Sequence, residues 1–232
     1  MVDAKINSCY LVWLVLVVSL TSSGFGIALV TTDELQNNYA LKMGWTAKEK
    51  EDNTTWLTVA SAFGLMLGSL TSSSVVKIGR RKAILMASIV SLLGGVMQLW
   101  RSFWVLVGGK VIYSSAAAVM LTGCALYLSE TLPSEKVGSH GFAVNLGVTL
   151  GISVLLGLGA LVPEEEDNGE WLLVAMFPIV TSIANFLVWL FLFRNESIGF
   201  CIQNQDKGDY KEQAYANIRK LYHTGGDEQI MY

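Results

Sequence analysis

The decapeptide LVWLVLVVSL, residues 11–20, contains nine apolar residues and a single serine. No apolar–polar alternation runs through it, so it is typical of a helix in hydrocarbon rather than of a barrel strand. Apolar residues return at 27–30, giving a stretch over residues 8–30. Spanning a bilayer takes about 20 mainly apolar residues. A cleaved signal peptide is the alternative interpretation, but the length of the stretch favours a membrane helix.

Five further stretches share this character, at 55–76, 83–100, 103–128, 140–162 and 171–193. Lys110 is the single full charge in the six stretches. The whole chain has 52% hydrophobic and 15% charged residues, whereas soluble domains carry about 25% charged residues. The sequence therefore predicts an all-α membrane protein, a bundle of six transmembrane helices over 1–193 with a polar tail over 194–232. Core helices of a large soluble protein are the alternative.

The basic residues are divided unequally between the two sides that six spans define. One side holds eleven: Lys5, Lys77, Arg80, Arg81, Lys82, Lys136, Arg194, Lys207, Lys211, Arg219 and Lys220. The other side holds four: Lys42, Lys48, Lys50 and Arg101. The positive-inside rule therefore predicts that both termini lie in the cytosol or its topological equivalent. The acidic run over 164–167 is interpreted as a solvated outer loop.

The tail contains the pattern of a short amphipathic helix. Asp209, followed three residues later by Glu212, makes a capping-box-like start, and Gly225-Gly226 makes a stop. The apolar residues recur at helical spacing at Tyr210, Ala214, Ile218 and Leu221. That face is expected against the bundle or on the bilayer surface, and a solvated tail is the alternative.

Close helix packing is predicted at two glycine pairs, Gly64-xxx-Gly68 and Gly147-xxx-Gly151. Small residues let helix backbones approach in lipid, where no hydrophobic force drives helices together. The spacing is common in membrane proteins and indicates no function.

Four segments resemble motifs of the sugar porters of the major facilitator superfamily. The run VKIGRRK at 76–82 resembles G-x-x-x-D-R-x-G-R-R, and YLSETLP at 127–133 with Gly138 resembles Y-x-S-E-x-x-P-x-x-x-R-G. Gly141, Asn145 and Gly151 match the start of the fifth helix, and NESIG at 195–199 resembles P-E-S-P-R. The retained motif residues are Gly68, Gly79, Arg80, Arg81, Glu130, Pro133, Gly138 and Glu196.

Three charged motif positions are occupied by uncharged residues. Val76 replaces an aspartate, and Val137 and Gly199 replace arginines. The resemblance implies that these charges, with partners such as Arg80 and Glu130, latch one half of the transporter to the other. It also implies a sugar-facing glutamine where this chain has Asn145, which is one methylene shorter.

Three residues are candidates to face a substrate: Lys110, Asn145 and Asn185. An intramembrane charge is a functional hypothesis by default, although Lys110 can also snorkel to the outer interface. Either asparagine can bond a sugar hydroxyl or a neighbouring helix. Cys9, Cys124 and Cys201 have neither metal-site nor disulfide-framework spacing. We expect no enzyme activity, no metal, no cofactor and no nucleic-acid partner, because no nucleophile–base pair, Walker loop or metal cluster is visible.

Such transporters hold substrate between two six-helix halves that rock against each other, and this sequence covers the first half. The favoured hypothesis is a half-transporter that has lost transport and serves as an accessory subunit of a larger membrane complex. The alternative is a hexose carrier that works as a homodimer or with a separate second half. A product without function is a third possibility. The lipid bilayer is an expected partner in each case, in a plasma membrane or an organellar inner membrane.

Overall fold

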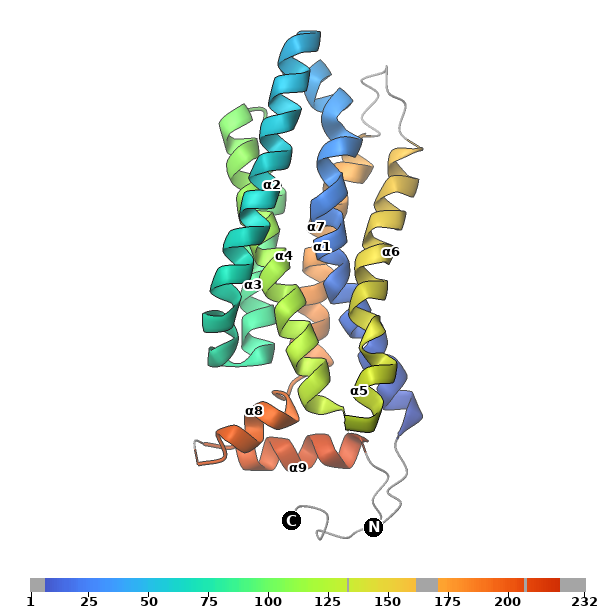
Figure 1. Ribbon diagram of the computed structural model, residues 1–232, viewed down its shortest axis with the longest axis vertical. Coiled ribbons are helices and arrows are strands. Elements are labelled where there is room, and N and C mark those ends of the chain that lie inside the picture. Colours follow the sequence, from blue (N-terminus) through green and yellow to red (C-terminus); the bar gives the residue numbers. More distant parts are fainter. Residues whose placement is uncertain (1–6, 133, 162–170, 207, 222–232) are drawn as a thin grey trace.

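The computed structural model describes residues 7–132, 134–161, 171–206 and 208–221. Figure 1 shows upright helices gathered into one bundle, with two short helices lying across its lower end. None of the described residues forms a strand. The all-α fold class predicted from the sequence is therefore confirmed.

The helices follow one another along the chain with short connections. Their bounds are α1 (Ser8–Met43), α2 (Ala47–Val75), the 3-10 turn η1 (Val76–Ile78), α3 (Arg80–Met97), α4 (Phe103–Thr131), α5 (Ser134–His140), α6 (Phe142–Gly159), α7 (Trp171–Phe191), α8 (Ile198–Gln203) and α9 (Tyr210–Leu221). The predicted acidic run over 164–167, Pro133 and the predicted stop at Gly225-Gly226 lie outside the described residues.

Five of the described helices are long and apolar enough to cross a membrane, where the sequence predicts six. The difference lies at 83–100, because α3 has only 18 residues and begins with Arg80, Arg81 and Lys82. Its charged first turn shortens its apolar part. Nevertheless, α3 packs inside the bundle against α4 and α7.

The helix ends differ from the predicted spans where polar residues remain helical. Helix α1 continues thirteen residues beyond 30 and ends at Gly44, which has a φ of 67°. A left-handed residue of this kind is a common helix end, and glycine adopts it without strain. Thr46 and Glu49 then form a capping box that begins α2. The predicted span 140–162 begins where α5 ends at His140, and α6 follows from Phe142.

Both predicted glycine pairs lie where two helix backbones approach closely. A Cβ atom added to Gly64 or Gly68 on α2 would lie 2.6 or 2.2 Å from a carbonyl oxygen of α4. A Cβ atom on Gly147 or Gly151 of α6 would lie 2.2 or 2.3 Å from a carbonyl oxygen of α1. Only glycine fits at such distances, so the predicted close packing is confirmed.

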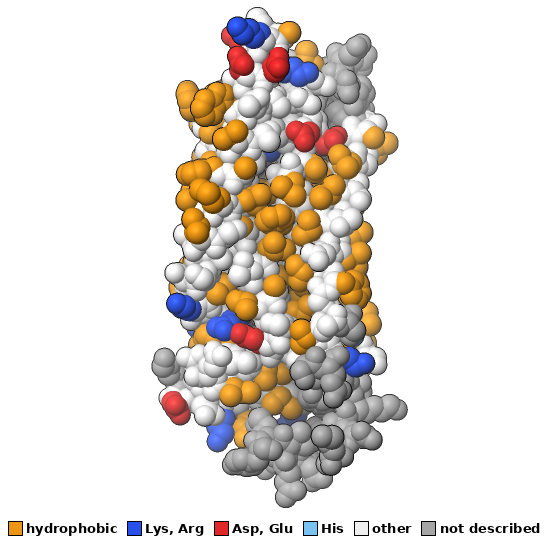
Figure 2. All heavy atoms as spheres, in the orientation of Figure 1, with side chains coloured by type: hydrophobic (Ala, Val, Ile, Leu, Met, Phe, Trp, Pro, Cys, Tyr) orange, Lys and Arg blue, Asp and Glu red, His pale blue; other side chains and the backbone are white. Residues whose placement is uncertain are grey.

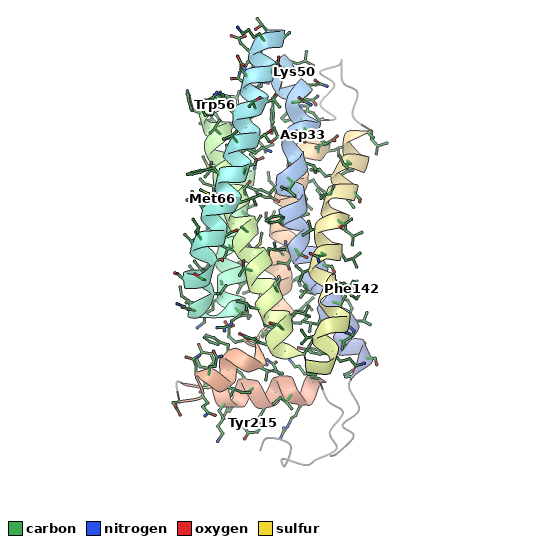
Figure 3. The ribbon with its side chains drawn as sticks, viewed as in Figure 1. Asp33, Lys50, Trp56, Met66, Phe142 and Tyr215 are labelled. Carbon is green, nitrogen blue, oxygen red and sulfur yellow. The ribbon has the colours of Figure 1, made fainter. Side chains whose placement is uncertain are left out.

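The outer surface is apolar over most of the bundle's length. Figure 2 shows hydrophobic side chains along the middle of this face and charged side chains toward its two ends. Trp56 and Met66 on α2 and Phe142 on α6 are half exposed or more, and Figure 3 shows them on the outside of the bundle. Such a surface is suited to lipid rather than to water.

The interior contains many small polar side chains. Hydroxyls such as those of Thr21, Thr31 and Ser88 donate to a carbonyl one turn earlier in their own helix. These bonds let a hydroxyl donate within its own helix, while the Thr21 oxygen also accepts from Trp189 Nε1 on α7 at 2.8 Å. The interior can therefore be polar in composition while its helices stay intact.

Candidate functional site

The turn between α2 and α3 depends on Gly79. Its φ of 146° and ψ of 139° are rarely adopted by a residue with a side chain. A Cβ atom here would also lie 2.6 Å from Oε1 of Glu196. Gly79 thus leaves room for a carboxylate at the first turn of α3.

Glu196 caps α3 from the far end of the chain. Its carboxylate accepts the backbone N–H of Arg81 at 2.8 Å and of Lys82 at 3.2 Å. Gly79 provides no capping side chain of its own. A carboxylate at a helix N-terminus satisfies free N–H groups and favours the helix dipole. Glu196 is buried, so this cap is held away from water.

Arg80 and Glu130 form an ion pair between α3 and α4. Nη2 of Arg80 lies 2.5 Å from Oε1 of Glu130, and Nε donates to the same oxygen at 3.0 Å. The two side chains are only 12% and 17% exposed. The other oxygen of Glu130 accepts a hydrogen bond from the Ser197 hydroxyl. The Arg80 guanidinium also lies 4.9 Å from the ring centre of Phe200.

Arg81 caps the C-terminus of helix α7. Its guanidinium donates to the carbonyl oxygens of Trp189 at 3.1 Å and Leu190 at 3.4 Å, and to that of Phe193. These carbonyls lie at the C-terminus of α7, where a cation is favoured. Arg80, Arg81, Glu130, Glu196 and Ser197 together are called the charge network below.

Helix α9 is attached to this network by amide side chains. Nδ2 of Asn217 donates to the Glu196 carbonyl at 2.7 Å, and Oδ1 of Asn217 accepts from Asn195 at 2.9 Å. The Gln213 side chain accepts the Glu196 N–H at 3.3 Å. The predicted amphipathic helix is thus present and packs on the bundle. Its binding residue Asn217 was missed, although it lies on the apolar face between Ala214 and Leu221.

The positions of lost motif charges are occupied differently. Val76 is buried, and its carbonyl accepts a bond from Arg80 at 3.4 Å. Val137 is half-buried on α5, and Gly138 is exposed with open space where a side chain would begin. A Cβ atom on Gly199 would lie 2.9 Å from Cβ of Glu130. An arginine at Gly199 therefore requires α8 to move away from α4.

The three candidate substrate-facing residues do not lie together. Lys110 is 1% exposed in the upper part of α4, so it does not snorkel. Asn185 is 1% exposed in α7, and Asn145 is exposed near the lower end of α6. Within the described residues, neither Nζ of Lys110 nor either amide atom of Asn185 has a hydrogen-bond partner. Their role in binding a substrate stays a prediction.

Solved structures with the same helix arrangement are transporters. The major facilitator superfamily proton:xylose symporter XylE, bound to 6-bromo-6-deoxy-D-glucose, matches with a TM-score of 0.74 and 16% identity. The match covers 92% of this chain and 50% of that one. XylE from E. coli in an inward-open conformation matches with a TM-score of 0.67 and 13% identity, over 89% of this chain and 54% of that one. The chain thus has the fold of half of a major facilitator.

The sequence comparisons give the family. The profile of the family described as "Sugar (and other) transporter" matches residues 12–230. The chain belongs to this family, and it is an integral, multi-pass membrane protein.

Two curated relatives are transporters of sugars by name. "Hexose transporter 1" of Plasmodium knowlesi is 26% identical over 232 residues, which cover 92% of this chain and 45% of the relative. "Solute carrier family 2, facilitated glucose transporter member 10" of Xenopus laevis is 28% identical, over 66% of this chain and 28% of the relative. The chain spans less than half the length of these relatives.

Proposed function

We propose that this chain forms one wall of a hexose carrier and works against a second six-helix half, wherever that half is encoded. The second half can be a further copy of this chain or a different sequence. The substrate class is proposed from two relatives, which are named as hexose and glucose transporters.

The charge network is the observation that carries this proposal. A largely buried ion pair contributes little net stability compared with packed apolar side chains. Stability alone therefore gives a poor reason for placing Arg80 and Glu130 at this interface. Paired charges at helix ends are suited to a protein whose halves change contacts, because each charge can exchange one partner for another.

The interior supports the same function. A carrier needs polar atoms that can bond sugar hydroxyls within a largely apolar bundle. Asn185 and Lys110 provide buried donors without partners among the described residues. Asn145 is exposed, and a facing half or a substrate can reach it.

Uptake into lipid vesicles tests the proposal. The chain is reconstituted alone, and also with the C-terminal half of the Plasmodium knowlesi hexose transporter, and labelled glucose uptake is measured. We expect uptake in at least one of these samples. Glu130→Gln should lower the rate at least tenfold, whereas Glu51→Gln, at an exposed position on α2, should not. No uptake in either sample, with no change of melting temperature on adding hexoses, would contradict the proposal.

An accessory role is the second candidate function. It is supported by the uncharged residues at Val76, Val137 and Gly199, which remove motif charges that a latch between halves would use. Purification from the native membrane in mild detergent should then give a complex much larger than 25.3 kDa. Sugar-dependent uptake by that complex, abolished by changes in this chain, would exclude a purely accessory role.

A further inference from the structure

A pocket of about 290 Å³ lies at the lower end of the bundle. It is lined by the first turn of α3, the segment after α7 and the start of α9. Three of its lining residues are basic and two are acidic. The lining residues are Arg81, Lys82, Arg194, Glu196, Gly208, Asp209, Tyr210 and Gln213.

The charges around the pocket are not equally available to a ligand. The Glu196 carboxylate accepts two backbone N–H groups, and the Arg81 guanidinium donates to carbonyls of α7. Nζ of Lys82 donates to the Tyr210 hydroxyl at 3.0 Å and keeps further donor capacity. The exposed guanidinium of Arg194 makes no hydrogen bond or ion pair within the described part of the chain. The cations of Lys82 and Arg194 are therefore available to a ligand, and the Asp209 carboxylate would repel an anion.

The size of the pocket limits what it can hold. Small-molecule sites begin at roughly 300 Å³, so this pocket admits a phosphate with its immediate substituents and excludes most of a nucleotide. Phe191 and Leu192, three and two residues before Arg194, are each 59% exposed. An apolar helix end followed by a free arginine is typical of the boundary between acyl chains and headgroups.

We propose that this pocket binds the headgroup phosphate of an anionic phospholipid, with Arg194 and Lys82 as its ligands. The acyl chains lie along the end of α7, and the phosphate enters between α3 and α9. In the predicted orientation, the pocket faces the cytosolic leaflet, where anionic lipids are abundant. This site is separate from any sugar pathway, and its test requires no transport.

Lipid binding to the purified chain is measured by native mass spectrometry, with phosphatidylglycerol against phosphatidylcholine as probes. We expect phosphatidylglycerol to bind preferentially. Arg194→Gln should weaken its binding about fivefold, which corresponds to the roughly 1 kcal/mol that one basic side chain contributes near an anionic bilayer. Asp209→Asn should strengthen binding. Arg219→Gln is the matched control, because Arg219 is exposed on α9 and does not line the pocket.

Each remaining outcome overturns the proposal. Both lipids carry a phosphate, so equal binding would show that the pocket has no preference for an anionic headgroup. Equal effects of Arg194→Gln and Arg219→Gln would mean that net charge alone attracts the lipid. If soluble glycerol phosphate displaces phosphatidylglycerol at similar concentrations, the ligand is a free phosphate compound rather than a lipid. Should Arg194→Gln fail to fold, an unchanged affinity in Asp209→Asn would still contradict the proposal.

Discussion

The lower end of the bundle and its middle differ in how fully their buried polar side chains are hydrogen-bonded. In the charge network, each carboxylate and guanidinium has at least two hydrogen-bond partners, and at least one of them lies on a distant segment of the chain. In the middle, the side-chain oxygen and nitrogen of Asn185 and the hydroxyl of Ser114 have no partner within the described residues. Both regions are buried, so burial alone does not explain the difference.

The comparison separates a region that is complete from one that has unused hydrogen-bonding capacity. Burying an unpaired polar group is unfavourable, and such groups often mark sites where function outweighs stability. The charge network holds α3, α4, α7 and α8 together. In the middle, the side-chain donors and acceptors of Asn185 and Ser114 are unused within the described residues.

The largest effect is expected from breaking the ion pair. Glu130→Ala leaves Arg80 and Ser197 without their shared acceptor, and removing one partner of a buried pair costs about 3–5 kcal/mol. The free energy of unfolding, measured by denaturant titration in detergent micelles, should fall by about 3 kcal/mol.

A double-mutant cycle checks the cause of this effect. Arg80→Ala combined with Glu130→Ala should cost less than the sum of the two single changes, since neither charge is then left alone. Strict additivity would show that the pair is not coupled.

A change of opposite sign is expected in the middle of the bundle. Asn185→Leu replaces an unpaired buried amide with an apolar side chain of similar size, and it should stabilise the fold by about 1 kcal/mol. Ser182→Ala, one turn earlier on α7, removes a 2.9 Å bond from Ser91 and should destabilise by about 1 kcal/mol. The same titration measures both. Destabilisation by Asn185→Leu would show that the amide is paired in solution.

The smallest effect concerns a thiol beside the network. Burial, followed by the charges of Glu196 and Glu130, raises the pKa of Cys201 to about 11. At pH 8 the thiol stays protonated and covered, so a maleimide should label it far more slowly than the exposed Cys9. Glu196→Ala removes one of the charges and frees α8, and the labelling rate of Cys201 should rise at least tenfold. Peptide mass spectrometry assigns the label, and an unchanged rate would argue against Glu196 holding α8 in place.

The sequence predicted the bundle because hydrophobic length is local information. The run at 11–20 indicates a membrane helix, and the glycine pairs indicate close contacts between helices. Each signal lies within a few residues of sequence. Helix ends were predicted less well, since α1 stays helical through polar residues until Gly44 stops it. An apolar stretch marks the part of a helix that lies in lipid, whereas the helix itself continues until the backbone leaves the helical conformation.

The structure brings together several residues that the motif resemblance selected, and their role in a site stays a prediction. The motif resemblance selected Gly79, Arg80, Glu130 and Glu196, but sequence spacing gives no indication that Glu196 caps a helix 115 positions earlier. Asn217 had a detectable signal, a polar residue on an apolar helix face. The sequence does not decide the burial of Lys110, because a lysine eight residues into a helix can reach the interface or turn inward.

Glu196 and Arg81 make the ends of two distant helices depend on each other. The carboxylate that follows α7 completes the beginning of α3, and a guanidinium in the first turn of α3 completes the end of α7. Neither helix can tilt alone without exposing its partner's terminal backbone groups. We therefore expect a displacement of either helix at this end of the bundle to move the other with it.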